Sequence, residues 1–222
     1  MSKLARAPRL NQRRIFTQGI AAVRETYANM NPKLVFTLKI TLTDTQPVIW
    51  RRLVVPADIT LLGLHHVIQA AMGWSNAHLH YFADKHGKFY TPTRPAGAVS
   101  DGSRTQLRTI FRTTGDWVRY VYDCGVAWEH TVELEVIGDA RQRSRRAECV
   151  GGQRRCPPED CGGPGSFAQL LEALAVKKRP TRSRLGINGR SQSFFQGWLE
   201  GPFKPEAFNR SRVNSTLRCL RV

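Results

Sequence analysis

The stretch from residue 34 to residue 42 reads LVFTLKITL, and its apolar and polar side chains alternate. A period of two puts the apolar side chains on one face, so the stretch predicts a β-strand with one buried face. A turn at Asp44–Pro47 separates it from a second apolar run, Val48–Val55, which contains Arg51 and Arg52. We therefore predict a β-hairpin, and we interpret the two arginines as charges that protect the edge of a sheet.

A helix is predicted after the hairpin, because apolar residues recur at helical spacing between Thr60 and Gly73. Thr60 is a suitable N-cap, since its hydroxyl can accept a hydrogen bond from a free backbone N–H. Gly73 suits the left-handed position just past the helix end. The apolar positions are Leu61, Leu64, Ile68, Ala71 and Met72, and His65 lies at the edge of their face.

Later segments predict a second hairpin, formed by Trp117–Asp123 and Glu129–Ile137, and a helix at Phe167–Val176. Short C-terminal helices are expected at Phe194–Leu199 and within Ala207–Leu220. The fold class that follows is α+β. We predict a compact single domain of antiparallel hairpins packed with helices over residues 32–222, preceded by a basic N-terminal arm over residues 1–31.

The composition fits a folded protein, since 41% of the 222 residues are hydrophobic and can form a sizeable core. No apolar run approaches the roughly 20 residues that span a bilayer. The N-terminal segment has no secretory pattern, so we expect a cytoplasmic protein without a membrane partner. In that reducing compartment, five cysteines suggest free thiols or metal ligands rather than disulfides.

The charge is strongly unbalanced, because 34 Lys and Arg face 17 Asp and Glu and give a net charge of +17. Such a field attracts polyanions, so nucleic acid is a candidate partner. The alternative is a solvated basic surface without a partner. The candidate nucleic-acid contacts are Arg6, Arg9, Arg13 and Arg14 in the arm, and Lys177, Lys178 and Arg179 after the predicted helix Phe167–Val176.

Three cysteines, Cys149, Cys156 and Cys161, crowd into one loop that is rich in Gly and Pro. Three thiolates, completed by a distant histidine, would suit a tetrahedral zinc ion, so zinc is the candidate cofactor. Their spacing is wider than in common zinc modules, and the alternative is a set of buried free thiols. In the same loop we interpret Glu159 and Asp160 as turn or helix caps, or as partners of a nearby arginine.

A second candidate site combines His78, His80, Asp123 and His130. In a strand, His78 and His80 would face the same side because they are two residues apart. Imidazoles with a carboxylate could hold a divalent metal or shuttle a proton. The alternative is structural packing and hydrogen bonding. The candidate ligand-binding residues are His65, Trp74, His78, His80, Asp123, Trp128 and His130.

Several rare motifs, in a fixed order, resemble those of the plasmid pRiA4b ORF-3-like family. They are Pro47-Val-Ile-Trp-Arg-Arg, Leu64-His65, Gln69-Ala-Ala-Met-Gly-Trp74, His78-Leu-His80, Tyr122-Asp123, Gly125, Trp128, His130, Cys149, Gly152, Arg154, Cys156-Pro-Pro-Glu-Asp-Cys-Gly-Gly163, Trp198, Phe203, Pro205, Phe208 and Asn214. The resemblance implies a compact α+β domain. Some members of the family lie in plasmids and insertion elements, and some carry a resolvase label.

The sequence departs from this family in two places. Similar proteins read Tyr-Asp-Phe-Gly-Asp in the central motif, whereas Cys124 and Val126 stand here at the third and fifth positions. The stretch Val176–Gln196 is basic, where similar proteins carry an acidic helix.

Recombinase chemistry is not expected. Ser2 is the only serine before Ser75, and the last tyrosine is Tyr122, so neither nucleophile stands where a recombinase needs it. We favour a binding role over an enzymatic one. The leading hypothesis is an accessory protein of a plasmid or mobile element that binds nucleic acid or a protein partner from the same element. The alternatives are a metal-dependent enzyme that uses the His/Asp set, in possibly degenerate form, and a pure interaction scaffold.

Overall fold

The alternating stretch forms β1 (Leu34–Leu42), and its predicted partner forms β2 (Ile49–Pro56). The two strands pair antiparallel, which confirms the first hairpin.

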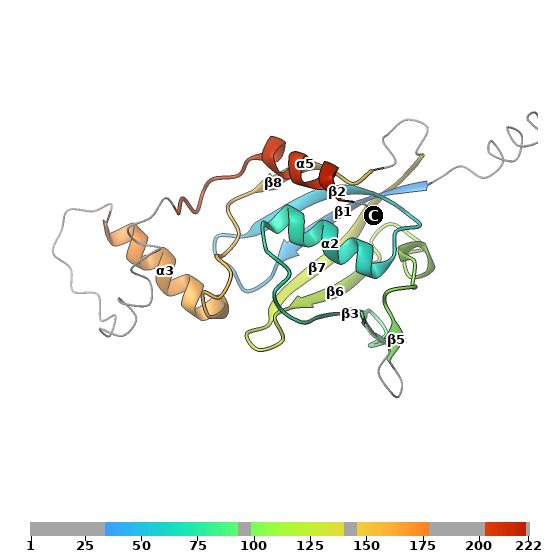
Figure 1. Ribbon diagram of the computed structural model, residues 1–222, viewed down its shortest axis with the longest axis horizontal. Coiled ribbons are helices and arrows are strands. Elements are labelled where there is room, and N and C mark those ends of the chain that lie inside the picture. The colour runs from blue at the N-terminus through green and yellow to red at the C-terminus, as the bar shows by residue number, and fades with distance from the viewer. Residues whose placement is uncertain (1–33, 93–98, 140–145, 178–202, 221–222) are drawn as a thin grey trace, which may run out of the picture. The chain divides into compact units, whose positions relative to one another are not determined.

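The computed structural model describes residues 34–92, 99–139, 146–177 and 203–220 (Figure 1). The chain divides after Lys33, and the unit 34–222 holds all of the described residues. The predicted arm at 1–31 and the predicted helix Phe194–Leu199 lie outside them.

The described strands form one sheet in the order β5-β4-β3-β6-β7-β1-β2-β8. Neighbours pair antiparallel except β4 and β5, which are parallel. The second predicted hairpin is confirmed as β6 and β7. The remaining strands are β3 (His80–Asp84), β4 (Phe89–Thr91), β5 (Ser100–Asp101), β6 (Trp117–Tyr122), β7 (Trp128–Asp139) and β8 (Glu148–Gln153).

Helix α2 (Leu61–Met72) lies against one face of this sheet (Figure 1). Thr60 caps it by accepting a hydrogen bond from the Gly63 amide, and Gly73 ends it in the left-handed region with φ of 87°. Both ends are where the sequence predicts them. Apolar side chains of α2 join those of β1, β2, β6 and β7 in one core. The domain is therefore α+β, as expected.

Two further helices follow the sheet, with a short 3-10 turn at Leu107–Thr109 before β6. Helix α3 (Gly163–Lys177) confirms the helix predicted at Phe167–Val176 and begins four residues earlier. Helix α5 (Arg210–Cys219) packs on α2 and β8. No helix of the described residues is long and apolar enough to cross a membrane.

The interpretation of Arg51 as an edge charge is wrong, because β2 lies between β1 and β8 and Arg51 is only 3% exposed. Its guanidinium donates to the carbonyl oxygens of Ala71, Trp50, Gln153 and Arg154, and it contacts the Cys156 sulfur at 3.1 Å. One buried side chain therefore joins the end of α2, strand β2 and the loop after β8.

Replacing Arg51 with Met should lower the free energy of unfolding by more than about 3 kcal/mol, because several buried carbonyl groups lose their donor. Arg52→Met is the matched control. Arg52 lies on the opposite face, is 38% exposed in its side chain and pairs with Glu135 at 2.5 Å. Its loss should cost about 1 kcal/mol or less. Urea unfolding of both variants measures the difference, and equal effects would contradict the role given to Arg51.

Candidate functional site

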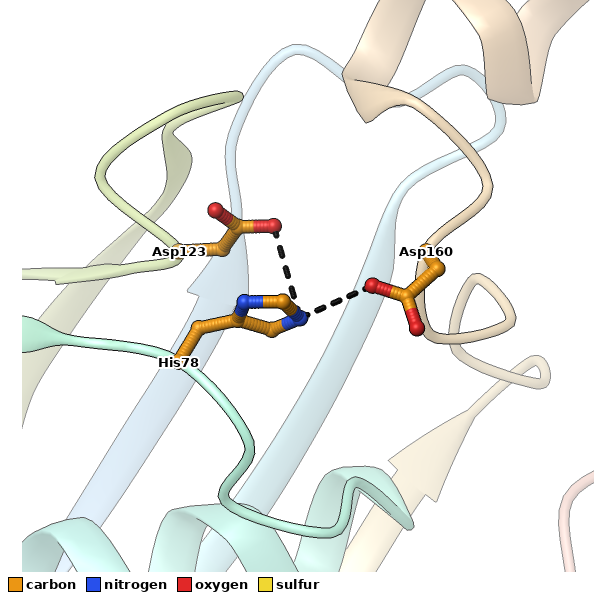
Figure 2. A group of neighbouring side chains, drawn as sticks. All are labelled: His78, Asp123 and Asp160. Carbon is orange, nitrogen blue, oxygen red and sulfur yellow. Dashed lines mark hydrogen bonds and ion pairs between the residues drawn. The ribbon is translucent and has the colours of Figure 1, made fainter.

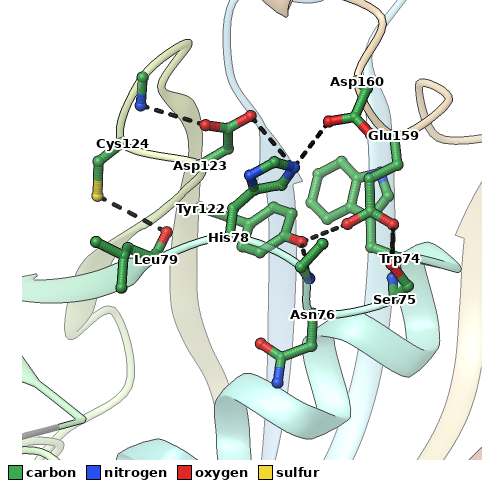
Figure 3. A network of polar contacts seen from close by, with 12 residues as sticks. Trp74, Ser75, Asn76, His78, Leu79, Tyr122, Asp123, Cys124, Glu159 and Asp160 are labelled. Atoms are coloured by element: carbon green, nitrogen blue, oxygen red, sulfur yellow. Dashed lines mark hydrogen bonds and ion pairs between the residues drawn. The ribbon is translucent and has the colours of Figure 1, made fainter.

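Three connections that are far apart in sequence meet at one end of the sheet (Figure 3). They are the segment between α2 and β3, the turn between β6 and β7, and the loop between β8 and α3. Each contributes polar side chains. His78 comes from the first segment, Asp123 from the second, and Glu159 and Asp160 from the third.

His78, Asp123 and Asp160 point toward one another (Figure 2). The Nε2 atom of His78 lies 2.9 Å from Oδ1 of Asp160 and 3.8 Å from Oδ2 of Asp123. Each of the three residues has one possible ligand atom that lies within 4.8 Å of the ligand atoms of the other two. Among the described residues, no other three His, Cys, Asp or Glu side chains bring their ligand atoms this close together. This group is therefore the part of the domain whose geometry suits a metal ion.

Glu159 points away from this group and ties the loop to the α2–β3 segment (Figure 3). Its carboxylate accepts hydrogen bonds from the Ser75 amide at 2.8 Å, from the Ser75 hydroxyl and from the Tyr122 hydroxyl. Burial favours the neutral acid, but these hydrogen bonds outweigh it and lower the pKa of Glu159. Glu159 and Asp160 were expected to cap a turn or the Phe167 helix, or to pair with Arg154 or Arg155. Of these, pairing with Arg154 is wrong, since Arg154 pairs with Glu206 at 3.1 Å.

Trp74 forms the inner wall beside this network. Its ring stacks on that of Tyr122 with centroids 5.1 Å apart, and its indole N–H donates to the Pro157 carbonyl at 3.0 Å. The ring of the buried Trp128 lies 6.1 Å away. Both tryptophans are thus packing residues at the base of the site.

His65 and His80 stack on each other behind the site, with ring centroids 3.4 Å apart and planes 4° from parallel. The ring nitrogens of His65 lie within hydrogen-bond distance of the Tyr120 hydroxyl, at 2.8 Å, and of Asn76 Oδ1, at 2.6 Å. Burial lowers the pKa of His65 to about 3 and that of His80 to about 4, and mutual charge repulsion with neighbouring histidines adds to both shifts. The pair is therefore neutral near pH 7.

His130 is fully buried on β7, between Tyr120 and Trp74. Its Nδ1 atom lies 3.4 Å from the Tyr120 carbonyl, and its Nε2 atom has no hydrogen-bond partner among the described residues. Burial lowers its pKa to about 4. A buried neutral imidazole of this kind packs against aromatic rings.

The predicted His/Asp set is thus divided. The structure brings His78 and Asp123 together, but it places His80 against His65 and buries His130 separately. The prediction that His78 and His80 share a strand face is wrong, because β3 begins at His80 and His78 lies before it. Asp160 was missed as a partner of His78. The two adjacent acids in the cysteine loop were the available signal in the sequence. However, His78, the residue that Asp160 contacts, is 82 residues away along the chain.

The three cysteines of the predicted zinc loop are buried and are free thiols. The Cys149 sulfur contacts the Gly151 carbonyl at 3.3 Å, and the Cys156 sulfur contacts Arg51 and the Met72 sulfur. Burial raises the pKa of Cys156 to about 11 and that of Cys161 to about 12. None of them belongs to the group of close ligand atoms in the described part of the chain, and zinc binding by this loop stays a prediction.

The positive charge is unevenly distributed. The described ranges contain 17 Lys and Arg and 15 Asp and Glu, a net charge of +2, so +15 of the total of +17 falls outside them. The predicted contacts Arg6, Arg9, Arg13, Arg14, Lys178 and Arg179 all lie outside, and Lys177 is the last residue of α3.

The fold and site define an α+β domain in which a helix-backed sheet carries a polar corner formed by three connections. The sequence model of the plasmid pRiA4b ORF-3-like protein family matches residues 34–212, and the chain belongs to that family. The expected resemblance is thereby confirmed.

One curated relative is the uncharacterized protein y4hQ of Sinorhizobium fredii. It is 39% identical over 142 residues, which cover 62% of this chain and 72% of that protein. Among solved structures, the chain is similar to the crystal structure of MM3350, a protein of unknown function from Methanosarcina mazei Go1. That match has a TM-score of 0.69 and 28% identity, and it covers 82% of this chain and 97% of the other.

Stability should fall as the pH drops below about 6.5, the pKa of an unfolded histidine, because the folded state keeps His130 neutral down to about pH 4. Protonation of His130 alone should lower the free energy of unfolding by about 2 kcal/mol between pH 6.5 and pH 5. His130→Phe should remove this part of the slope, while His65 and His80 retain theirs. Urea unfolding at several pH values measures the slopes, and parallel curves for both proteins would contradict the assignment.

Proposed function

We propose that this protein is an accessory protein of a plasmid or mobile element that binds nucleic acid through phosphate contacts, without recombinase chemistry. The observation that carries the proposal is the solvent-facing side of α5. This ten-residue helix contains three arginines and three hydroxyl side chains, and it contains no carboxylate. Arginine and hydroxyl groups are the side chains that most often contact phosphate oxygens.

The exposed positions of α5 carry mostly polar side chains. Those of the types that contact phosphate in other proteins are Arg210, Ser211, Arg212, Ser215, Thr216 and Arg218. Two other residues hold the helix in place, because Leu217 is buried and Asn214 makes two hydrogen bonds to the backbone of Cys149 on β8. A rigidly seated helix can present these groups to a phosphate backbone without losing much conformational freedom on binding.

The charge distribution supports the same function. The described residues carry a net charge of +2, and the other +15 lies on the residues before Leu34 and on further segments within the unit 34–222. Basic segments of this kind add nonspecific affinity by releasing counterions from nucleic acid. The arm residues Arg6, Arg9, Arg13 and Arg14 would add phosphate contacts of their own to those of α5. A protein partner from the same mobile element remains the competing occupant of this surface.

The test is binding of a labelled DNA duplex of arbitrary sequence, measured by fluorescence anisotropy over a series of salt concentrations. Replacing Arg210, Arg212 and Arg218 together with Gln should weaken binding about tenfold or more. It should also reduce the slope of log affinity against log salt by about 3, because three phosphate contacts are lost.

A matched control removes the same charge elsewhere. Arg104, Arg108 and Arg112 are exposed and lie around the 3-10 turn, away from α5 in sequence. Replacing them together with Gln should change affinity and slope much less. Equal losses in the two variants would assign the effect to net charge alone. Absence of DNA and RNA binding by the unmodified protein at moderate salt would overturn the proposed function.

A further inference from the structure

The corner formed by His78, Asp123 and Asp160 has a chemistry that the proposed function does not use. We propose that these three side chains bind a divalent transition-metal ion, with Nε2 of His78 and one carboxylate oxygen from each aspartate as its ligands. The ion would join the α2–β3 segment, the β6–β7 turn and the cysteine loop. This site contains no residue of α5, and its test requires no nucleic acid.

The distances between the ligand atoms support the proposal. Two atoms bonded at about 2.1 Å to one ion, at angles of 90–110°, lie about 3.0–3.4 Å apart. The separations from His78 Nε2 are 2.9 Å to Asp160 and 3.8 Å to Asp123, and the two carboxylates lie within 4.8 Å of each other. Small side-chain rotations would therefore bring all three atoms into one coordination sphere.

The charge of the corner supports it independently. Asp123, Glu159 and Asp160 place three carboxylates at one end of the sheet, although the chain as a whole carries +17. Within the described ranges no lysine or arginine forms an ion pair with any of the three, and the side chain that contacts both Asp123 and Asp160 is the imidazole of His78. A bound cation would supply the missing positive charge.

The ligand types indicate which ions would bind. Imidazole favours zinc, iron, copper or nickel over magnesium and calcium, and carboxylates also accept manganese. Asp160 is 74% exposed in its side chain, so the open side of the ion would face solvent. Three protein ligands leave at least one position for water or for an anionic ligand, as in open metal sites.

The frame around the three ligands is already fixed. Glu159, next to Asp160, is held by Ser75 and Tyr122, and the amide of Asp123 donates to the Leu79 carbonyl at 2.9 Å. Asp160 supplies the second carboxylate beside Asp123 from a different loop.

The experiment is titration of the full-length, untagged protein with Zn²⁺ by calorimetry and with Mn²⁺ by electron paramagnetic resonance. Mn²⁺ is the more selective probe, because it prefers oxygen and nitrogen ligands to thiolates. We expect one bound ion per chain and a higher melting temperature with the ion present. His78→Ala, Asp123→Asn and Asp160→Asn should each weaken binding about tenfold or more.

The aspartate variants are chosen to keep the fold. Asp123 and Asp160 have φ values of 56° and 60°, and asparagine tolerates this left-handed conformation. His86→Ala is the matched control, because His86 is an exposed histidine outside the corner and its loss should leave binding unchanged.

Cys156→Ser and Cys161→Ser distinguish this site from the predicted zinc loop. Retention of the ion by both would support the corner site. The proposal is overturned if zinc survives His78→Ala but is lost in the cysteine variants, if all variants bind equally, or if neither ion binds the unmodified protein.

Discussion

The buried guanidinium of Arg51 is the interaction on which the arrangement of this domain depends. Its donors are directed to backbone carbonyls from three elements, and it has no carboxylate partner among the described residues. The ring of Phe208 covers it, with 4.6 Å between the guanidinium carbon and the ring centroid. Gly152 makes this possible, since a Cβ atom there would lie 2.5 Å from Phe208. A buried charge that is satisfied by fixed carbonyls specifies one packing of these elements.

This constraint extends to the candidate metal site. Arg51 holds the carbonyl of Arg154 and contacts Cys156, so the loop after β8 leaves the sheet in a defined direction. A few residues later, Trp74 binds the Pro157 carbonyl and Ser75 binds Glu159. Asp160 therefore reaches His78 at the end of a segment that is anchored at three successive points. The cysteines in this segment are buried by the same anchoring.

Features set by local pattern could be predicted from the sequence, and features set by long-range contact could not. The alternation in β1 and the Thr60 and Gly73 caps of α2 depend on near neighbours, and they are where the pattern places them. The partner of His78 is 82 residues away, and no local spacing indicates it. The orientation of His78 was mispredicted because β3 begins at His80, two residues after His78. A residue outside the strand does not follow the alternation of side chains between the two faces of the sheet. Likewise, the +17 charge predicts a polyanion partner but not which surface of the domain would contact it.

A groove of about 560 Å³ is lined by Arg212 of α5 and by Glu159, the chain neighbour of the proposed metal ligand Asp160. Without a cation, the carboxylates of the corner would repel a phosphate backbone that lies along α5. A bound divalent ion would weaken that repulsion, so cation binding and nucleic-acid binding would favour each other. Such coupling is reciprocal, because each ligand changes the affinity for the other by the same factor. It would also weaken at high salt, since the interaction crosses a solvent-filled groove and is screened over about 10 Å.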